Sequence, residues 1–248
     1  MKRLIAALLL TATPAMALDL GAMSDGEKAA FGEAVREYLM ENPQVLIESI
    51  NVLEERRLAD EAANDDQLVA ANRDALFEDG HSWIGGNPEG GLTVIEFIDY
   101  RCGVCRRFDA ELRQVVAEDG DIRFVQKEFP ILGQDSEMSS RFAIAVKQIA
   151  GDAAYDKAHH ELIALRGPAT LAALRDVAGR IGVDPDAVVN TMNTAPVNDV
   201  LRKNRQLAER MAIMGTPTFV VGETLLRGVP AAGIAATVAE IRRAQEEG

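Results

Sequence analysis

Two cysteines three positions apart are the residues of this chain best suited to chemistry. Cys102 and Cys105 are the only cysteines in the sequence, and they stand in the motif Cys102-Gly103-Val104-Cys105. On a helix this spacing places the two thiols one turn apart, close enough to close an intramolecular disulfide. A thiolate in such a pair can attack a substrate disulfide, and the second thiol can resolve the mixed disulfide. The motif therefore predicts thiol–disulfide exchange.

Three other uses of these thiols compete with that interpretation. A structural disulfide would close a very small loop and would gain little loop-closure entropy. A zinc site needs four ligands, and the only other candidates are His81, His159 and His160. A copper(I) site stays open, because soft thiolates suit that ion. We expect no resident metal or cofactor, and the alternative function is a copper(I)-binding or chaperone-like periplasmic module that uses the same thiols.

The elements around the motif are expected to place it where a thiolate is stabilised. Residues 93–100 are rich in β-branched and aromatic side chains, which predicts a buried strand, and residues 122–129 predict a second. Residues 106–118 between them have helical periodicity, so the three segments predict a βαβ unit with a parallel pair. Cys102 would then lie at the N-terminus of the helix, where unpaired N–H groups favour an anion.

The rest of the chain predicts a small mixed sheet that is interrupted by helices. Residues 136–213 contain no convincing strand and divide into short helices at glycines and prolines. Strands return at 218–221 and 224–227, and a last helix covers about 231–246. The fold class is therefore α/β with an all-helical insertion at about 136–213.

Glu96 is the charged residue most directly tied to the thiols. It shares the strand alternation of Ile98 and Tyr100, which predicts a buried carboxylate with a raised pKa, suited to taking the proton of Cys105. The alternative is an exposed or salt-bridged Glu96, for which Lys127 on the neighbouring strand is the obvious partner.

The start of the chain predicts export. Lys2 and Arg3 precede a short apolar run at 4–10, and the small-x-small ending Ala15-Met16-Ala17 follows, which together indicate a secretory signal peptide at 1–17. The run is too short to span a bilayer, and we expect no membrane span in the mature form. Export would place both thiols in a compartment that permits disulfides.

Residues 18–77 predict an N-terminal helical arm ahead of a domain at 78–248. Its apolar stripe fades after Leu58, so the arm is either a solvated helix packed on its own domain or an oligomerisation element. The sequence has 26 Lys and Arg against 39 Asp and Glu, a formal net charge of −13. That balance argues against nucleic acid or anionic lipid as the main partner, since phosphate binding depends on Lys and Arg.

The run Glu96–Phe108 resembles the active-site segment of DsbA-family thiol–disulfide oxidoreductases. Residues 127–132 and 215–219 match two further segments of that family in the same order, and the resemblance covers about 82–246. It implies a thioredoxin fold with a helical insertion. It also implies protein substrates with cysteines, and a membrane redox partner.

The resemblance assigns a role to each matching residue. It implies that Cys102 is the exposed nucleophile and that Cys105 is the buried resolving thiol. Glu96 would be the buried carboxylate, and Thr216-Pro217 would be the cis-proline loop that binds the substrate chain.

The two residues between the cysteines depart from the best-known members of the family. Those enzymes have Pro-His there, whereas this chain has Gly103-Val104, which we also expect to contact substrate. Without an imidazolium beside it, the Cys102 thiolate should be less stabilised, which predicts a less oxidising protein.

Residues 38–57 resemble the N-terminal region of ScsC-like proteins, the suppressors of copper sensitivity. Some of those proteins self-associate through this region and isomerise disulfides, with links to copper tolerance. The resemblance favours a homo-oligomer formed through residues 24–77. Together these observations predict a periplasmic oxidoreductase that oxidises or isomerises disulfides in other exported proteins through the pair Cys102 and Cys105.

Overall fold

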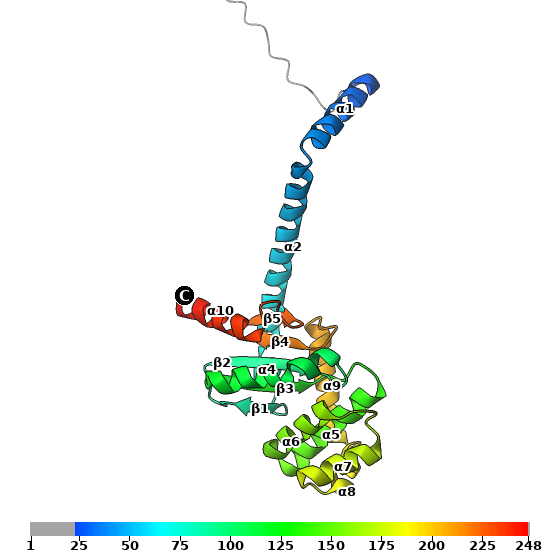
Figure 1. Ribbon diagram of the computed structural model, residues 1–248, viewed down its shortest axis with the longest axis vertical. Coiled ribbons are helices and arrows are strands. Elements are labelled where there is room, and N and C mark those ends of the chain that lie inside the picture. Colours follow the sequence, from blue (N-terminus) through cyan, green and yellow to red (C-terminus); the bar gives the residue numbers. More distant parts are fainter. Residues whose placement is uncertain (1–22, 248) are drawn as a thin grey trace, which may run out of the picture. The chain divides into compact units, whose positions relative to one another are not determined.

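The chain divides into two units. The computed structural model describes residues 23–247, without the side chains of 57–59, 61–62 and 245–247 (Figure 1). The first unit ends at Ala59 and the second begins at Asp60. The predicted signal peptide, residues 1–17, lies outside the described residues.

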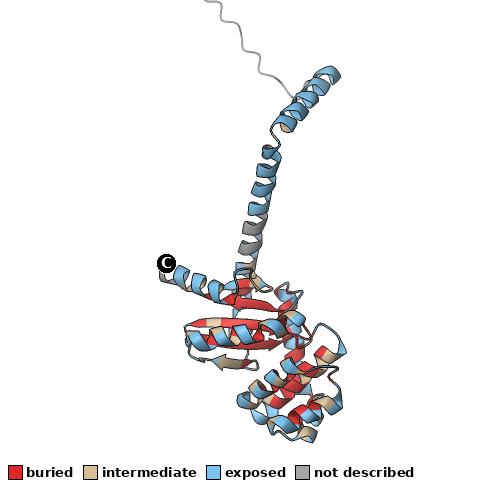
Figure 2. Cartoon of the chain, in the orientation of Figure 1, coloured by how far each residue is buried: buried red, intermediate tan, exposed pale blue. Residues whose placement is uncertain are grey.

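The first unit is helical and exposed. Helix α1 (Asp25–Glu41) begins at a capping box, in which Ser24 and Glu27 each bond the backbone N–H of the other. Helix α2 (Gln44–Ala71) follows and continues into the second unit. Figure 2 shows both helices in pale blue, the colour of exposed residues, over most of the first unit. The large apolar side chains that this unit leaves exposed are Phe31, Val35, Tyr38, Met40, Leu46, Ile47, Ile50, Val52 and Leu53.

The second unit is built on one mixed sheet, as the sequence predicts. Among the described residues its strands are β1 (Trp83–Gly86), β2 (Leu92–Ile98), β3 (Ile122–Glu128), β4 (Thr218–Val221) and β5 (Thr224–Arg227). Their order in the sheet is β1-β3-β2-β4-β5, and β2 and β3 are parallel while the other pairs are antiparallel. The predicted βαβ unit is confirmed, because α4 (Gly103–Asp119) connects β2 to β3. Strand β1 was not predicted.

The predicted all-helical insertion is also confirmed. It lies between β3 and β4 and consists of α5 (Gln134–Ala150), α6 (Asp152–Ala164), α7 (Leu171–Ile181), α8 (Pro185–Thr191) and α9 (Ala195–Arg210). The remaining helices of this unit are α3 (Arg73–Phe77) before β1 and α10 (Ile234–Glu247) after β5.

The sheet separates two hydrophobic clusters, because alternate residues of a strand face opposite sides. Val94 and Ile98 of β2 belong to the cluster that contains Leu112 of α4 and the buried residues of the insertion. Ile95 and Phe97 belong to the other cluster, which residues of α3 and α9 complete. The central strands are accordingly buried along nearly their whole length (Figure 2). Two covered faces hold β2 rigidly, and β2 leads directly into the cysteine motif.

Residues 60–77, which the sequence predicts as the end of the arm, pack with the second unit. Val69 of α2 and Leu76 of α3 are almost fully buried in the cluster of Ile95 and Phe97. None of the helices in the described part of the chain has the length and apolar character that crossing a membrane requires.

A buried ion pair holds the segment before β1 against the sheet. The Lys127 ammonium is fully buried and bonds the Asp79 carboxylate, and it also donates to the Ala75 carbonyl at 2.9 Å. Although burial raises the pKa of Asp79, the ammonium of Lys127 lowers it well below its ordinary range. Asp79 is therefore held in its charged form beside Lys127, although burial lowers the pKa of the Lys127 ammonium.

Candidate active site

Cys102 is the N-cap residue of α4. The helix begins at Gly103, and the Cys102 sulfur accepts a hydrogen bond from the backbone N–H of Cys105 at 3.5 Å. The sulfur thus takes the place of the side-chain oxygen that usually caps a helix, and it faces the positive end of the helix dipole. The expected position of Cys102 at a strand–helix junction is confirmed.

The loop before β4 lies against this sulfur. The Thr216–Pro217 peptide bond is cis, as the resemblance implies, and the Cys102 thiol donates to the Thr216 carbonyl at 3.1 Å. Cys102 and Thr216 are far apart in the sequence, so the contact depends on the antiparallel pairing of β4 with β2. The structure therefore brings together the cysteine motif and the proline loop.

Cys102 is more enclosed than the resemblance implies, whereas Cys105 is buried as the resemblance implies. Cys102 keeps only 6% of its surface exposed and Cys105 keeps 1%, and both are free thiols. The prediction of an exposed Cys102 is wrong in degree, because the cis-proline loop covers the sulfur. Both cysteines belong to the cluster of Leu112, and Cys102 keeps slightly more access to solvent than Cys105.

The two thiols have opposite pKa shifts. Burial raises the pKa of Cys102, but the N–H groups of Cys105 and Val104 and the Thr216 side chain outweigh it, so that the net shift is downward. Burial, followed by the Glu96 carboxylate, raises the pKa of Cys105 well above its ordinary value. Near neutral pH the thiolate therefore forms at Cys102 first, and Cys105 holds its proton.

Glu96 is buried, and its polar partner is Gln126. The Gln126 amide donates to the Glu96 carboxylate at 3.3 Å, because the parallel register places these two residues opposite each other. The alternative of a salt bridge with Lys127 is wrong. Lys127 is the register partner of Phe97, so it points to the opposite face of the sheet and pairs with Asp79.

The pKa of Glu96 is set by its burial. Removal from water and the Asp109 carboxylate raise it, the Arg113 guanidinium and the Gln126 hydrogen bond lower it, and the resulting pKa is about 8. Glu96 in turn raises the pKa of Cys105, so the two groups are electrostatically coupled. A carboxyl group that titrates near pH 8 can both accept and return a proton at working pH.

Asp99 is a residue of the site that the sequence analysis missed. It is fully buried, and its carboxylate accepts hydrogen bonds from the backbone N–H groups of Arg101, Ile131 and Leu132, at 2.8, 2.8 and 3.0 Å. Its carbonyl accepts from the Cys102 N–H at 3.0 Å. Asp99 thus fixes the turn that leads into the motif. An Asp directly after a strand was the available signal.

A second missed group is a buried polar network beneath α4. The His159 ring lies 2.6 Å from the Asp109 carboxylate and 3.3 Å from the Tyr100 hydroxyl. The hydroxyls of Tyr100 and Tyr155 donate to the Glu128 carboxylate at 2.9 and 2.5 Å. Burial lowers the pKa of His159 to about 4 and raises that of Glu128 to about 7. His159, which the sequence offered as a metal ligand, is therefore a neutral residue of the core.

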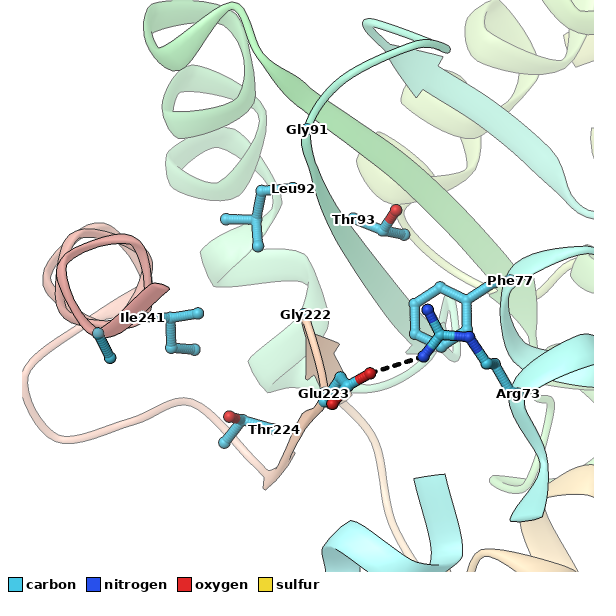
Figure 3. A pocket seen from close by; sticks show the side chains of 10 residues that line it. Arg73, Phe77, Gly91, Leu92, Thr93, Gly222, Glu223, Thr224 and Ile241 are labelled. Atoms are coloured by element: carbon cyan, nitrogen blue, oxygen red, sulfur yellow. Dashed lines mark hydrogen bonds and ion pairs between the residues drawn. The ribbon is translucent and has the colours of Figure 1, made fainter. Parts of the chain in front are cut away.

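Two cavities of similar size have different relations to the thiols. One of about 440 Å³ lies between α3, the start of β2, the β4–β5 turn and α10. The ion-paired Arg73 and Glu223 line it, and no thiol does (Figure 3). The other, of about 400 Å³, is lined by Met214 and the cis-proline loop, next to the Thr216 carbonyl that Cys102 contacts. Of these two cavities, the second is the one that borders the loop in contact with the Cys102 sulfur.

Two family models match this chain. The DSBA-like thioredoxin domain matches residues 93–237, and the Copper resistance protein ScsC N-terminal domain matches residues 27–59. The first match includes both cysteines, Glu96 and the cis-proline loop.

Solved structures resemble the chain over most of their own length. A thioredoxin-like oxidoreductase from Silicibacter pomeroyi is 34% identical, with a TM-score of 0.65, over 71% of this chain and 98% of that one. The catalytic domain of Proteus mirabilis ScsC is 26% identical, with a TM-score of 0.64, over 71% and 97%.

Curated relatives match more distantly. Disulfide bond formation protein D of Bacillus subtilis is 23% identical over 153 residues, which are 57% of this chain and 68% of that protein. The chain spans only 21% of Na(+)/H(+) antiporter NhaA 1 from Salinispora arenicola, to which it is 26% identical over 139 residues. With its sheet order, its helical insertion and a family match over more than half of its length, the chain belongs to the DSBA-like thioredoxin domain family.

Proposed function

We propose that this chain is an exported, periplasmic thiol–disulfide oxidoreductase that oxidises or isomerises disulfides in other exported proteins. The observation that carries the proposal is the position of Cys102, whose sulfur caps α4 and touches the Thr216 carbonyl of the cis-proline loop. Activity on reduced and on scrambled ribonuclease, compared between the natural chain and a Cys102→Ser variant, tests it.

The proposed reaction begins with the Cys102 thiolate. Its sulfur attacks one sulfur of a substrate disulfide, a Cys102–substrate disulfide forms, and the other substrate sulfur leaves as a thiolate that takes up a proton. The Cys105 thiol then loses its proton and attacks Cys102, so that the Cys102–Cys105 disulfide forms and the substrate leaves reduced. Two electrons pass from the protein to the substrate, and oxidation of a substrate runs the same steps in reverse.

The surroundings of the thiols support the order of these steps. The lowered pKa of Cys102 supports its role as the attacking thiolate, and the raised pKa of Cys105 supports a resolving thiol that needs a base. Thr216 and Pro217 are proposed to hold the substrate backbone beside the sulfur, while Gly103 and Val104 contact it from the helix. Gly103-Val104 offers no imidazolium, which supports a less oxidising protein. Oxidation of a substrate leaves Cys102 and Cys105 as thiols, and a membrane redox partner is proposed to restore their disulfide.

Glu96 is proposed to take the proton of Cys105 during resolution. We expect the rate of substrate release from the mixed disulfide to rise with pH through about 8, as Glu96 becomes a carboxylate. A Glu96→Gln variant has no base there, so it should lose this rise and release substrate about 10²-fold more slowly at pH 8.5, the lower end for general base catalysis. Single-turnover kinetics at about pH 6 to 9 measure both the rise with pH and the slower release by the variant. This range covers the titration of Glu96.

A Glu128→Gln variant is the matched control for that experiment. Glu128 is another buried carboxyl group near Glu96, with a pKa of about 7, and the hydroxyls of Tyr100 and Tyr155 bond it. The control should keep the rise, displaced to somewhat lower pH because the Glu128 charge raises the pKa of Glu96. Glu96 has no part in the proton transfer if its variant and the natural chain give parallel pH profiles.

The exposed apolar residues of α1 and α2 support self-association through residues 24–77. In the full chain, a Leu46→Glu/Ile50→Glu variant places two charges on side chains that are exposed here, and it should reduce the mass measured by light scattering from an oligomer to one chain. A Ser49→Glu/Asn51→Glu variant adds the same charges at exposed polar positions of the same helix and should stay oligomeric. A single-chain mass for the natural protein would contradict this part of the proposal.

A second candidate function is copper(I) binding by the same thiols. It is favoured by the match of residues 27–59 to a domain described as that of a copper resistance protein. Within the described residues no group of three or more His, Cys, Asp and Glu side chains is placed to hold a metal, so the ligands would be the two thiols. The ribonuclease assays separate the candidates. If the chain is only a copper module, the rates of ribonuclease oxidation and reshuffling should be the same with the natural chain and with the Cys102→Ser variant.

A further inference from the structure

Four arginines lie where the start of α4 meets the segment after α6, in a chain with a net charge of −13. Arg101 precedes the cysteine, Arg106 and Arg107 lie on the first turns of α4, and Arg166 follows α6. Besides burial, the charges of Arg101 and Arg166 lower the pKa of Arg106, so the three guanidinium groups are within electrostatic reach of one another. The segment after α6 therefore meets the start of α4, and positive charge gathers there.

Two of these side chains are held at the motif itself. Arg106 donates to the carbonyls of Ile163 and Leu165 at 2.9 and 2.8 Å, which fixes it without cancelling its charge. Arg107 turns back over the gap between the cysteines, with one guanidinium nitrogen 3.6 Å from where a Cβ of residue 103 would lie. In a substrate bound at Cys102, a residue next to the reacting cysteine that lies beside Gly103 would contact the Arg107 guanidinium.

The cluster is largely uncompensated. Arg101 has a distant carboxylate partner, Asp135 at 3.8 Å, and one of its terminal nitrogens is buried without a partner. Arg107 and Arg166 are exposed, and in the described part of the chain neither forms an ion pair. Among the described residues, Asp135 is the one ion-pair partner within 4 Å of this cluster, and the α4 dipole adds positive potential beside it.

We propose that this arginine cluster selects substrates whose reactive cysteine is flanked by acidic residues. The proposal rests on the proposed function and specifies its substrate class. Opposite charges at the reacting sulfur raise the rate of encounter and fix the register of an extended chain, whereas a basic flank is repelled. Since the chain as a whole has a net charge of −13, a local cluster of positive charge also directs such a chain toward Cys102.

The test uses three peptides, each with one cysteine carried as its 2-pyridyl disulfide and flanked by two Glu, two Gln or two Lys residues. In a full-length Cys105→Ser background, the Cys102 thiolate attacks the peptide sulfur and a Cys102–peptide disulfide forms. The pyridyl–peptide disulfide breaks, and pyridine-2-thione leaves with a proton, which its absorbance records. The readout is the ratio of the rate for the acidic peptide to that for the neutral one.

We expect the acidic peptide to react about 10-fold faster than the neutral one at low salt, with the ratio falling as salt is added. An Arg107→Gln/Arg166→Gln variant should bring the ratio close to one, and Arg107→Glu/Arg166→Glu should reverse the preference in favour of the basic peptide. An Arg202→Gln/Arg243→Gln variant removes the same charge from exposed arginines of α9 and α10 and should keep the ratio. Equal rates for the three peptides would overturn the inference, and no reaction with any peptide would instead contradict the proposed function.

Discussion

A Cys102→Ser variant is expected to lose about 10³-fold or more of the activity on both reduced and scrambled ribonuclease. The reason is that a serine hydroxyl at the start of α4 stays protonated near neutral pH, whereas the cysteine there has a lowered pKa. The substitution is nearly isosteric, and a serine can cap the helix, so the fold should be retained. Circular dichroism and the unfolding midpoint check that retention.

A Cys105→Ser variant is the control that separates attack from resolution. It keeps the Cys102 thiolate, so it should form mixed disulfides at a rate close to that of the natural chain but fail to release them. It should therefore lose oxidation of reduced ribonuclease and keep a part of the reshuffling activity. If Cys102→Ser and Cys105→Ser kept equal activity on scrambled ribonuclease, Cys102 would not be the attacking thiol.

The largest expected effect on stability comes from the buried pair of Asp79 and Lys127. An Asp79→Ala variant leaves the fully buried ammonium of Lys127 without its carboxylate, which should lower the free energy of unfolding by about 3 to 5 kcal/mol. An Asp79→Leu/Lys127→Met variant removes both charges and should recover most of that loss. Urea unfolding at pH 7 measures all three proteins, at a pH where the natural pair is ionised.

Arg73 and Glu223 provide the matched comparison for this pair. They also join distant parts of the chain, at 2.6 Å, but their side chains are 62% and 75% exposed (Figure 3). A Glu223→Ala variant should therefore change the free energy of unfolding by less than about 1 kcal/mol. A loss as small as this for Asp79→Ala would show that the buried pair does not hold the segment before β1.

The parts of the fold that the sequence predicts are those determined by residues close together in the chain. The β-branched run before Cys102 and the helical periodicity after it predict the βαβ unit, and this alone places the thiol at a helix N-terminus. The Glu96 carboxylate is buried as the alternation of β2 predicts, because Ile98 and Tyr100 face the same cluster. Each of these signals lies within a few residues of its effect.

The parts that the sequence does not predict depend on distant pairing. Strand β1 contains Gly85, which favours a turn. In the structure the Trp83 ring lies over Gly85, and a Cβ at that position would be only 2.1 Å from the ring, so the strand needs a glycine there. Pairing with β3 then makes the segment a strand. The pairing of Glu96 with Gln126 depends in the same way on the register of β2 with β3, and that register cannot be predicted from the amino-acid sequence alone.

The most direct test of the proposed chemistry is the capture of a mixed disulfide at Cys102. Reduced Cys105→Ser protein is mixed with a peptide disulfide, quenched with acid, digested and analysed by mass spectrometry, with Cys102→Ser protein treated in parallel. We predict one peptide per chain, joined to Cys102 in the first protein, and no stable adduct at Cys105 in the second at neutral pH, because Cys105 keeps its proton. Comparable adducts on both proteins, or none on the first, would contradict the assignment of Cys102 as the attacking thiol.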